Sequence, residues 1–344
     1  MNFVTSIIDK LQRHPKRILF PEGEEPRVIQ AARQFYAMRL GVPILLGDPK
    51  KIKLVAEDLK VPIDHIGMIN PAESDSLVDF ARRYEVLRKY KNIKGAESIE
   101  VMKNPLYFGA MMLWTNQVDG LVSGASHTTG SVLRPLFQII KTAPNSKVVS
   151  SCMIIETNDS SIGDNGVLFF ADCGVIPDPT VEQLSDLSVS TARLARQLTG
   201  IKPRVAMLSF STRGSAKHPT ADKMAAAAAM AREEAKREMV DMEVDGELQA
   251  DTAIIPDIAR AKITDSMVAG RANVLIFPDL NAGNIATKLV QRIGKTNAFG
   301  QILLGLARPA ADLSRGCSTH DILGVAAIVG LQAIEYRHLY PNQQ

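Results

Sequence analysis

The chain has 344 residues, of which 46% are hydrophobic, so it is long enough to bury more core than one ordinary domain holds. Its 40 Lys and Arg residues nearly balance 37 Asp and Glu residues, and the net charge of +3 provides no basic footprint for nucleic acid. Three cysteines without a CxxC pair are typical of a reducing compartment, and they predict neither a disulfide framework nor a structural zinc site.

The first 17 residues read as a short amphipathic helix that lacks the apolar core and cleavage site of a signal peptide. No apolar run approaches the length that spans a bilayer. We therefore expect a soluble, cytoplasmic protein with no membrane partner.

Short apolar segments then alternate with helical segments along the chain, beginning with a strand at 17–20, a helix through 31–35, a strand at 43–46 and a helix through 52–59. Further strands are expected at 120–123, 147–155, 166–171, 204–210, 273–277 and 301–306. The Ala-, Lys-, Glu- and Met-rich stretch 221–239 predicts a helix from propensity alone. This alternation favours an α/β fold with a largely parallel sheet and helices on its faces.

Two domains are expected, the second inserted into the first. The plainest break lies at 142–147, and the chain is expected to return near 294–298. The prediction is a discontinuous domain I, 1–145 with 297–344, and an inserted domain II, 146–296.

The segment 311–324, ADLSRGCSTHDILG, concentrates hydroxyl groups, a guanidinium and a carboxylate where a loop meets a helix. Ser318 is expected to cap that helix, whose N-terminus favours anions, and Arg315 adds a bidentate phosphate donor. Asp321 lies in the first turn, where its carboxylate could face the same site as Ser314 and take a proton from a thiol. The alternative is structural, because Ser318-x-x-Asp321 is also a capping-box pattern and Ser314 an ordinary turn residue.

A second candidate is the segment 122–134, VSGASHTTGSVLR, in which a strand enters a small-residue loop before a helix. Backbone N–H groups and the hydroxyls of Ser126, Thr128 and Thr129 could bind a phosphate there. The alternative is a routine strand-to-helix turn in which Thr129 or Ser131 is the N-cap.

Two further segments could bind anions. The basic run 82–94 includes Arg88 on an expected helix and could hold the phosphates of a nucleotide, although such runs are usually solvated faces. The NAGN stretch at 281–284 could cradle an anion or be a plain helix start.

The DLSRGCS segment at 312–318 resembles the C-terminal motif of phosphate acetyltransferases, in the phosphate acetyl/butyryl transferase family. Other segments of the chain resemble family segments in the same order: PEGEEPR at 21–27, SGASHTTG at 123–130, FADC and PDPT within 170–180, LSFSTRGS at 208–215, DGELQ at 245–249 and FPDLNAGN at 277–284. Several motifs in order, spread over nearly the whole chain, make this resemblance specific.

The resemblance implies two α/β/α domains like those of isocitrate and isopropylmalate dehydrogenases, with an active-site cleft between them. The catalytic motif would belong to domain I, and domain II would complete the cleft and supply the contact of a homodimer. The implied reaction, in acetate metabolism, is direct transfer of an acetyl group between acetyl phosphate and coenzyme A. Coenzyme A is then a substrate, and neither a metal nor a permanently bound cofactor is implied.

Carried over by motif, the family's general base falls on Asp321. Its transition-state hydroxyl falls on Ser314, and its phosphate-holding arginine on Arg315. This assignment is chemically sensible, because a thiol with a pKa of about 8.5 attacks only as its thiolate.

The resemblance also implies substrate-binding residues. Arg134 and Arg88 match family arginines that are associated with substrate or coenzyme A binding. Ser126, Thr128 and Thr129 would be ligands in the phosphate loop.

Alternatives come from acyl preference and from other protein classes. Ala310 and Ala311 stand before DLSRGCS, where a Val-Asn pair is expected in many members of the family that the chain resembles. The acyl preference could therefore differ, and a phosphate butyryltransferase is the first alternative. A decarboxylating dehydrogenase would need nicotinamide and metal signatures that the sequence lacks. A non-catalytic acetyl-CoA sensor is disfavoured because the chain keeps Ser314, Arg315 and Asp321 together.

Overall fold

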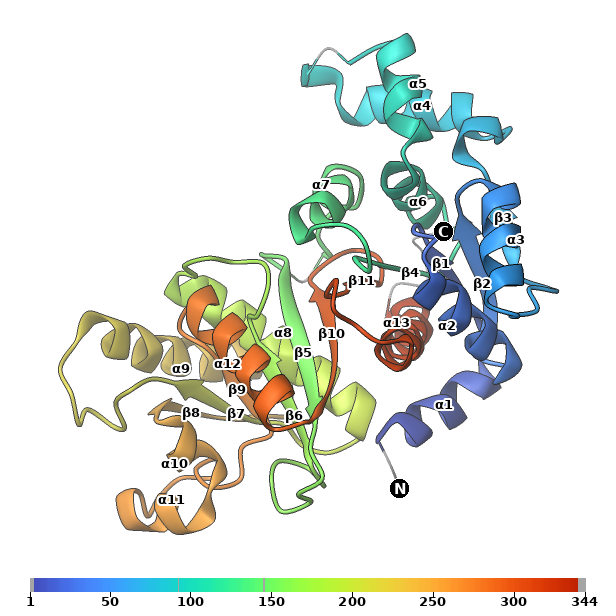
Figure 1. Cartoon of the computed structure of the whole chain (residues 1–344). Coiled ribbons are helices and arrows are strands. Elements are labelled where there is room, and N and C mark those ends of the chain that lie inside the picture. The colour runs from blue at the N-terminus through green and yellow to red at the C-terminus, as the bar shows by residue number, and fades with distance from the viewer. Residues whose placement is uncertain (1–2, 92, 145, 340–344) are drawn as a thin grey trace. The chain divides into compact units, whose positions relative to one another are not determined.

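Two compact units make up the computed structural model, which describes residues 3–91, 93–144 and 146–339 (Figure 1). Unit 1 comprises Met1–Lys141 and Leu306–Gln344, and unit 2 comprises Thr142–Gly305. The second change of unit thus falls after residue 305, later than the 296/297 boundary that the sequence suggested, and residue 145 of the first expected boundary lies outside the described residues.

Unit 1 contains a parallel sheet in the strand order β3-β2-β1-β4-β11. Its strands are β1 (Lys16–Phe20), β2 (Gly41–Leu46), β3 (Gly67–Ile69), β4 (Gly120–Ser123) and β11 (Ala310–Asp312). Because the carboxyl ends of parallel strands share one edge, the segments that follow β1, β4 and β11 meet there.

Helices cover both faces of this sheet. The helical elements of unit 1 are α1 (Phe3–Arg13), α2 (Pro26–Ala37), α3 (Pro49–Asp58), η1 (Pro71–Glu73), α4 (Leu77–Leu87), η2 (Lys89–Lys91), α5 (Ala96–Lys103), α6 (Pro105–Trp114), α7 (Thr129–Ile139) and α13 (Thr319–Leu339). A side chain on Gly109 of α6 would strike Leu19 and Leu121, whereas one on Gly120 would strike Val329 of α13. Successive strand residues face opposite sides, so α6 and α13 lie on opposite faces of β1 and β4.

Helix α13 is the central helix of unit 1. Residues 322–331 are all buried, and the helix packs against α1, α2, β1 and β4. A helix that is apolar on every side needs cover on every side. Gly330 allows the close approach of α1, because a Cβ there would lie 2.9 Å from Leu11 Cδ2.

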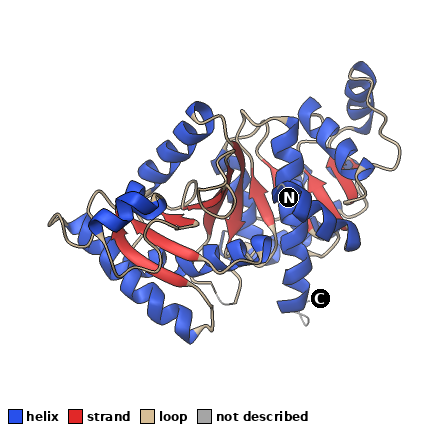
Figure 2. Ribbon diagram, turned by 90° about the horizontal axis from the view of Figure 1, so that it is seen from below, coloured by secondary structure: helices blue, strands red, loops and turns tan. Residues whose placement is uncertain are grey.

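Unit 2 contains strands in the order β10-β5-β6-β9-β7-β8. They are β5 (Ser150–Glu156), β6 (Val167–Ala171), β7 (Arg204–Leu208), β8 (Glu243–Leu248), β9 (Val274–Ile276) and β10 (Asn297–Leu304). β5 pairs antiparallel with both β10 and β6, and the other pairings are parallel. Its helices are α8 (Val181–Thr199), α9 (Pro219–Arg237), α10 (Ala250–Ile254), α11 (Pro256–Lys262) and α12 (Leu280–Ile293). In Figure 2, helices flank the strands of each unit.

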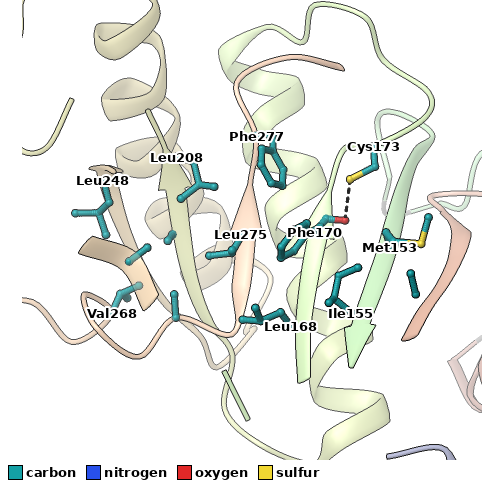
Figure 3. Close-up of a cluster of buried hydrophobic side chains, with 14 residues drawn as sticks. Met153, Ile155, Leu168, Phe170, Cys173, Leu208, Leu248, Val268, Leu275 and Phe277 are labelled. Carbon is teal, nitrogen blue, oxygen red and sulfur yellow. Dashed lines mark hydrogen bonds between the residues drawn. The ribbon is translucent and has the colours of Figure 1, made fainter. Parts of the chain in front are cut away.

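A buried apolar cluster on the sheet of unit 2 contains side chains of all six of its strands, of α10 and of the loops beyond the strands (Figure 3). The Phe170 and Phe277 rings pack 5.3 Å apart at its centre, and Cys173 lies at one end. Ala282, Ala286 and Val290 of α12 close the cluster from outside, which seats that helix on the sheet.

The predicted α/β fold with a largely parallel sheet is confirmed. The predicted strand at 120–123 coincides with β4, and the helix predicted at 221–239 is α9. The strands β3, β8 and β11 were not predicted. β10 begins at Asn297, four positions earlier than expected, because its first residues pair with β5.

We predict that Leu11→Ala lowers the stability of unit 1 by about 2–5 kcal/mol, because it leaves a cavity between α1 and α13 where Leu11 is fully buried. Thermal unfolding would measure the change, with Leu54→Ala as the control, since Leu54 is 62% exposed. Equal shifts in the two variants would contradict the packing of α1 on α13.

Candidate active site

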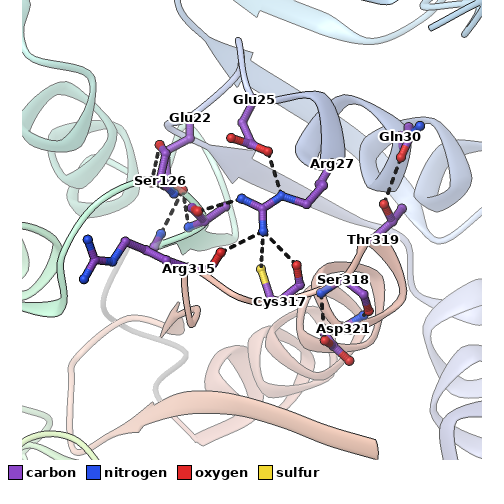
Figure 4. A network of polar contacts seen from close by, with 12 residues as sticks. Glu22, Glu25, Arg27, Gln30, Ser126, Arg315, Cys317, Ser318, Thr319 and Asp321 are labelled. Atoms are coloured by element: carbon purple, nitrogen blue, oxygen red, sulfur yellow. Dashed lines mark hydrogen bonds and ion pairs between the residues drawn. The ribbon is translucent and has the colours of Figure 1, made fainter.

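The carboxylate of Glu22, in the segment after β1, lies inside the loop that follows β4 (Figure 4). It accepts hydrogen bonds from the backbone N–H groups of Gly124 and Ala125, each at 2.8 Å, and of Ser126 and His127, each at 2.9 Å. The Ser126 hydroxyl at 3.0 Å and His127 Nδ1 at 2.7 Å complete the set. Glu22 therefore occupies the anion-binding concavity that this loop forms.

This contact changes the expected role of the loop. The backbone N–H groups of 124–127, predicted to hold a substrate phosphate, are instead used by an internal carboxylate. No local pattern indicates this partner, because Glu22 lies 102 residues before Gly124. Ser126 is exposed, but its hydroxyl donates to Glu22.

Burial of Glu22 acts to raise its pKa, yet the hydrogen bonds from Ser126, His127 and Ala125 outweigh burial and lower the pKa below its ordinary value. The group is therefore an anion at neutral pH, and its charge is matched by aligned N–H dipoles. A buried charge with this many donors stabilises one loop conformation.

Arg27 of α2 connects this loop to the C-terminal motif (Figure 4). Its guanidinium donates to the carbonyl oxygens of Ala125 at 2.8 Å, Arg315 at 2.9 Å and Cys317 at 2.8 Å. Its Nε pairs with Glu25 at 2.7 Å. The planar fork of a guanidinium suits such simultaneous contacts, so Arg27 holds the two segments at a defined distance.

The expected catalytic residues Ser314 and Arg315 lie in a tight turn between β11 and α13. The Cys317 N–H donates to the Ser314 carbonyl at 2.9 Å, and the Gly316 N–H points to the Ser314 hydroxyl at 3.4 Å. Arg315 is exposed, and its side chain points away from Asp321 in Figure 4. Burial raises the pKa of the Cys317 thiol to about 11, so this cysteine is not a nucleophile at neutral pH.

Asp321 forms the capping box that was the alternative interpretation of its position. Its Oδ2 accepts from the Ser318 N–H at 2.8 Å, and the Ser318 hydroxyl accepts from the Asp321 N–H at 3.2 Å. Thr319 adds a hydrogen bond to Gln30 of α2 at 2.9 Å. Asp321 is half-buried, and a carboxylate with one capping contact keeps further acceptor capacity.

The start of α7 differs by one residue from the expected cap. Thr128, and neither Thr129 nor Ser131, is the N-cap, and its hydroxyl lies 3.3 Å from the Ser131 N–H and 2.9 Å from the Ser131 hydroxyl. Thr129 instead is the hydrogen-bonding neighbour of the Asp312 carboxyl at the end of β11. Arg134 lies on the exposed side of the same helix.

Arg88 is not on a helix, contrary to the sequence prediction, because α4 ends at Leu87 and Arg88 is its C-cap. Its Nε is buried and finds no hydrogen-bond acceptor among the residues described. It lies beside Tyr84, whose hydroxyl donates to Gln138 of α7 at 2.7 Å. Since Gln138 is one helical turn after Arg134, the two predicted arginines are brought to neighbouring parts of unit 1.

In unit 2 the NAGN stretch is a helix start. Asp279 is the N-cap of α12 and accepts from the Ala282 N–H at 2.9 Å. Asn284 donates to the carbonyl of Cys173 at 3.0 Å, which ties α12 to the end of β6. Its contacts are those of the structural alternative.

Sequence reasoning missed Glu22, Arg27 and Asp312. The first two lie in PEGEEPR, and the third begins DLSRGCS, so the motifs contained them without indicating what they contact. Asp312 is 1% exposed and its Oδ1 has no hydrogen-bond partner within the described structure. Burial raises its pKa to about 7, the Thr129 hydrogen bond opposes that shift, and the Glu22 charge adds to it.

The described residues contain no group of three or more His, Cys, Asp or Glu side chains that could hold a metal ion. Nor does any helix in the described part of the chain have the length and apolar character needed to cross a membrane.

Comparison with known proteins defines an α/β transferase. Residues 2–330 match the family described as phosphate acetyl/butaryl transferase. The chain is 46% identical over 333 residues to the phosphate acetyltransferase of Thermoanaerobacterium thermosaccharolyticum, covering 97% of this chain and 100% of that one. The EutD phosphotransacetylase structure from Staphylococcus aureus superimposes with a TM-score of 0.86 at 38% identity, covering 96% of this chain and 98% of that one. The chain belongs to the phosphate acetyl/butaryl transferase family.

The expected dehydrogenase-like architecture is confirmed at the level of the fold. A putative 4-hydroxythreonine-4-phosphate dehydrogenase from Salmonella typhimurium superimposes with a TM-score of 0.54 at 11% identity, covering 93% of this chain and 99% of that one. At that identity the likeness concerns the fold alone.

We predict that Glu22→Gln destabilises unit 1 by about 2–4 kcal/mol, because a neutral amide replaces the anion that accepts these hydrogen bonds. Since the folded pKa of Glu22 is lowered, its stabilisation is present above the ordinary value of 4.5 and is lost as the pH falls through the folded pKa. The gap in melting temperature between wild type and variant should therefore narrow from about pH 7 to about pH 3.

Glu57→Gln is the matched control, because Glu57 is exposed on α3. A Glu22→Gln gap that does not change with pH would show that the carboxylate is not held as an anion by the loop.

Proposed function

We propose that the chain transfers an acetyl group between phosphate and coenzyme A, interconverting acetyl phosphate plus coenzyme A with acetyl-CoA plus phosphate. The observation that carries the proposal is the 46% identity over nearly the full chain to a phosphate acetyltransferase. The arrangement of DLSRGCS between the buried end of β11 and the N-terminus of α13 supports it, because that position suits an anionic substrate.

In the proposed mechanism, Asp321 removes the proton of the coenzyme A thiol, and the thiolate attacks the carbonyl carbon of acetyl phosphate. A carbon–sulfur bond forms, the bond from that carbon to the phosphate oxygen breaks, and phosphate leaves with the electron pair. The hydroxyl of Ser314 and the guanidinium of Arg315 would stabilise the charge that develops on the carbonyl and phosphate oxygens. Coenzyme A enters as a substrate, and the scheme uses no permanently bound cofactor or metal.

The capping contact of Asp321 supports its proposed role as the general base. The contact with Ser318 orients the carboxylate at the start of α13, and a positioned carboxylate is what general base catalysis requires. The Arg27 hydrogen bonds to the Arg315 and Cys317 carbonyls hold the turn that carries Ser314. Asp321 and Ser314 thus lie on backbone segments that other hydrogen bonds hold in place.

For substrate binding, we propose that Arg88 and Arg134 contact the substrates. We also propose that Thr128 and Thr129, at the N-terminus of α7, bind a phosphate, which a helix N-terminus stabilises. Thr128 is exposed and offers its hydroxyl to a substrate, whereas Ser126 is exposed but would first have to release its hydrogen bond to Glu22. The buried Nε of Arg88 supports its part, because a buried donor gains most from an anionic acceptor.

We also propose that the enzyme works as a cytoplasmic homodimer in acetate metabolism, on the resemblance to its family and on a cysteine pattern that suits a reducing compartment. The assignment of the dimer contact to 146–296, and of the catalytic motif to 1–145 with 297–344, stays a prediction. Sedimentation of the purified protein tests the dimer.

We predict that Asp321→Asn lowers kcat for thioester formation by about 10²–10⁴-fold with little change in coenzyme A affinity, because it removes the base and little binding area. Thioester absorbance with acetyl phosphate and coenzyme A measures the rate. Parallel assays with propionyl and butyryl phosphate would show which acyl chain the enzyme transfers fastest.

Ser318→Ala is the control that separates the two roles of Asp321. It removes the capping hydroxyl, at a cost of about 1 kcal/mol, but leaves the carboxylate. Its kcat should change only a few-fold. If Asp321→Asn and Ser318→Ala lose equal activity, Asp321 acts as a cap and not as the base.

We predict that Arg88→Ala raises the KM for coenzyme A by about tenfold, the effect of losing one charge-assisted hydrogen bond, and that dephospho-coenzyme A, which lacks the 3′-phosphate, shows a smaller change. Arg83→Ala is the control, because Arg83 pairs with Asp79 on the exposed side of α4. Equal losses with both coenzymes would argue against a contact between Arg88 and the 3′-phosphate.

A further inference from the structure

The Asp312 carboxyl lies at the last position of β11, two residues before Ser314. It is paired in register with Ser123 at the end of β4, and both side chains are buried. A Cβ on Gly124 would lie 2.5 Å from Asp312 Oδ1, so the loop backbone packs directly against that oxygen. The carboxyl therefore sits between the loop after β4 and the turn that carries Ser314.

The neighbours of Asp312 offer little to a negative charge. Its Oδ1 has no donor among the described residues, and the hydroxyl of Ser123 is likewise buried without a partner there. Thr129 of α7 supplies a hydrogen bond, whereas the Glu22 anion raises the energy of a second negative charge. Burial, the largest effect, raises the pKa of Asp312 to about 7.

Charged and titratable groups approach Asp312 from the segment after β1 and from the start of α13. Glu22 faces it from the segment after β1, and His127 lies beyond the Glu22 carboxylate. β4 and α7 contribute the uncharged Ser123 and Thr129. Just before α13 lies Cys317, and the charges of Arg27, Asp321 and Glu22 all act on the pKa of its thiol.

Ionisation would add a second negative charge near the Glu22 anion, in a site that admits no side chain on Gly124. Relief would require movement of the loop or of the end of β11. The Leu313 N–H donates to the Ser123 carbonyl at 2.6 Å, so such a movement reaches the turn at Ser314 as well as the start of α7.

We propose that Asp312 is a positioning residue for acyl transfer: its protonated carboxyl lets the loop after β4 and the Ser314 turn pack together in the active arrangement, and its ionisation near the Glu22 anion disturbs that packing. This inference rests on the proposed function. Asp312 acts through the placement of the loop after β4 and of Ser314, and it touches no substrate itself.

Asp312→Asn is the test, because asparagine has the shape of the protonated acid and cannot ionise. The ratio of kcat for the variant to kcat for wild type should rise up to about tenfold from about pH 6 to about pH 8, as a group with a pKa of about 7 loses its proton. Because the folded pKa is raised above the ordinary value of 3.8, wild-type stability should also fall relative to the variant from about pH 4 to about pH 7 and then level off, which melting temperatures would measure. Asp58→Asn, at the exposed end of α3, should show neither trend.

A flat activity ratio overturns the proposal, even if the melting temperatures diverge, because Asp312 would then titrate without affecting the site. Parallel melting temperatures also overturn it, since a pH-dependent ratio would then come from another group. A wild type that forms no thioester at any pH refutes the proposed function instead, whereas the melting comparison still reports whether Asp312 titrates.

Thr129→Val provides a second test that does not alter the carboxyl. The Thr129 hydrogen bond lowers the pKa of Asp312, so its removal should move the inflection in kcat to higher pH. The measurement uses kcat at saturating substrate, so that a binding role of Thr129 would appear in KM. An inflection that stays in place or moves to lower pH contradicts the proposal.

Discussion

The interaction on which the site depends is the burial of one carboxylate, Glu22, inside the loop that follows β4. Taking a carboxylate out of water costs several kcal/mol unless its oxygens are supplied with donors. The loop 124–127 supplies them from successive backbone N–H groups. These N–H groups would otherwise lack acceptors, so the carboxylate also satisfies the loop. Anion and loop thus require each other, and α7 begins from the position that this pairing sets.

A second arrangement extends that constraint to the C-terminal motif. Arg27 donates to carbonyl oxygens on the loop and on the turn before α13, so two segments from distant parts of the chain are spaced by one guanidinium. Most contacts here are to backbone groups. The side chains proposed to act on substrate therefore lie on backbone segments that hydrogen bonds from other side chains hold in place, as is expected of a preorganised site.

Features that depend on local sequence were predictable. The strand at 120–123, the helix at 219–237 and the pairing of Ser318 with Asp321 each follow from periodicity, propensity or a three-residue spacing. The partners Glu22 and Arg27 were not, since they act across 102 and 288 residues and no local pattern specifies a contact at that separation. Short strands such as β11 carry too few residues to show a period.

Because unit 1 is divided along the chain, the ribosome completes unit 2 before it completes unit 1. Residues 142–305 leave the ribosome before α13 does, so unit 2 has all of its strands available while unit 1 still lacks its central helix. Until α13 arrives, the apolar faces of α1, α2 and β4 that it covers are exposed to water. During this interval nascent unit 1 presents the kind of surface that chaperones recognise, and translation through the last helix ends it.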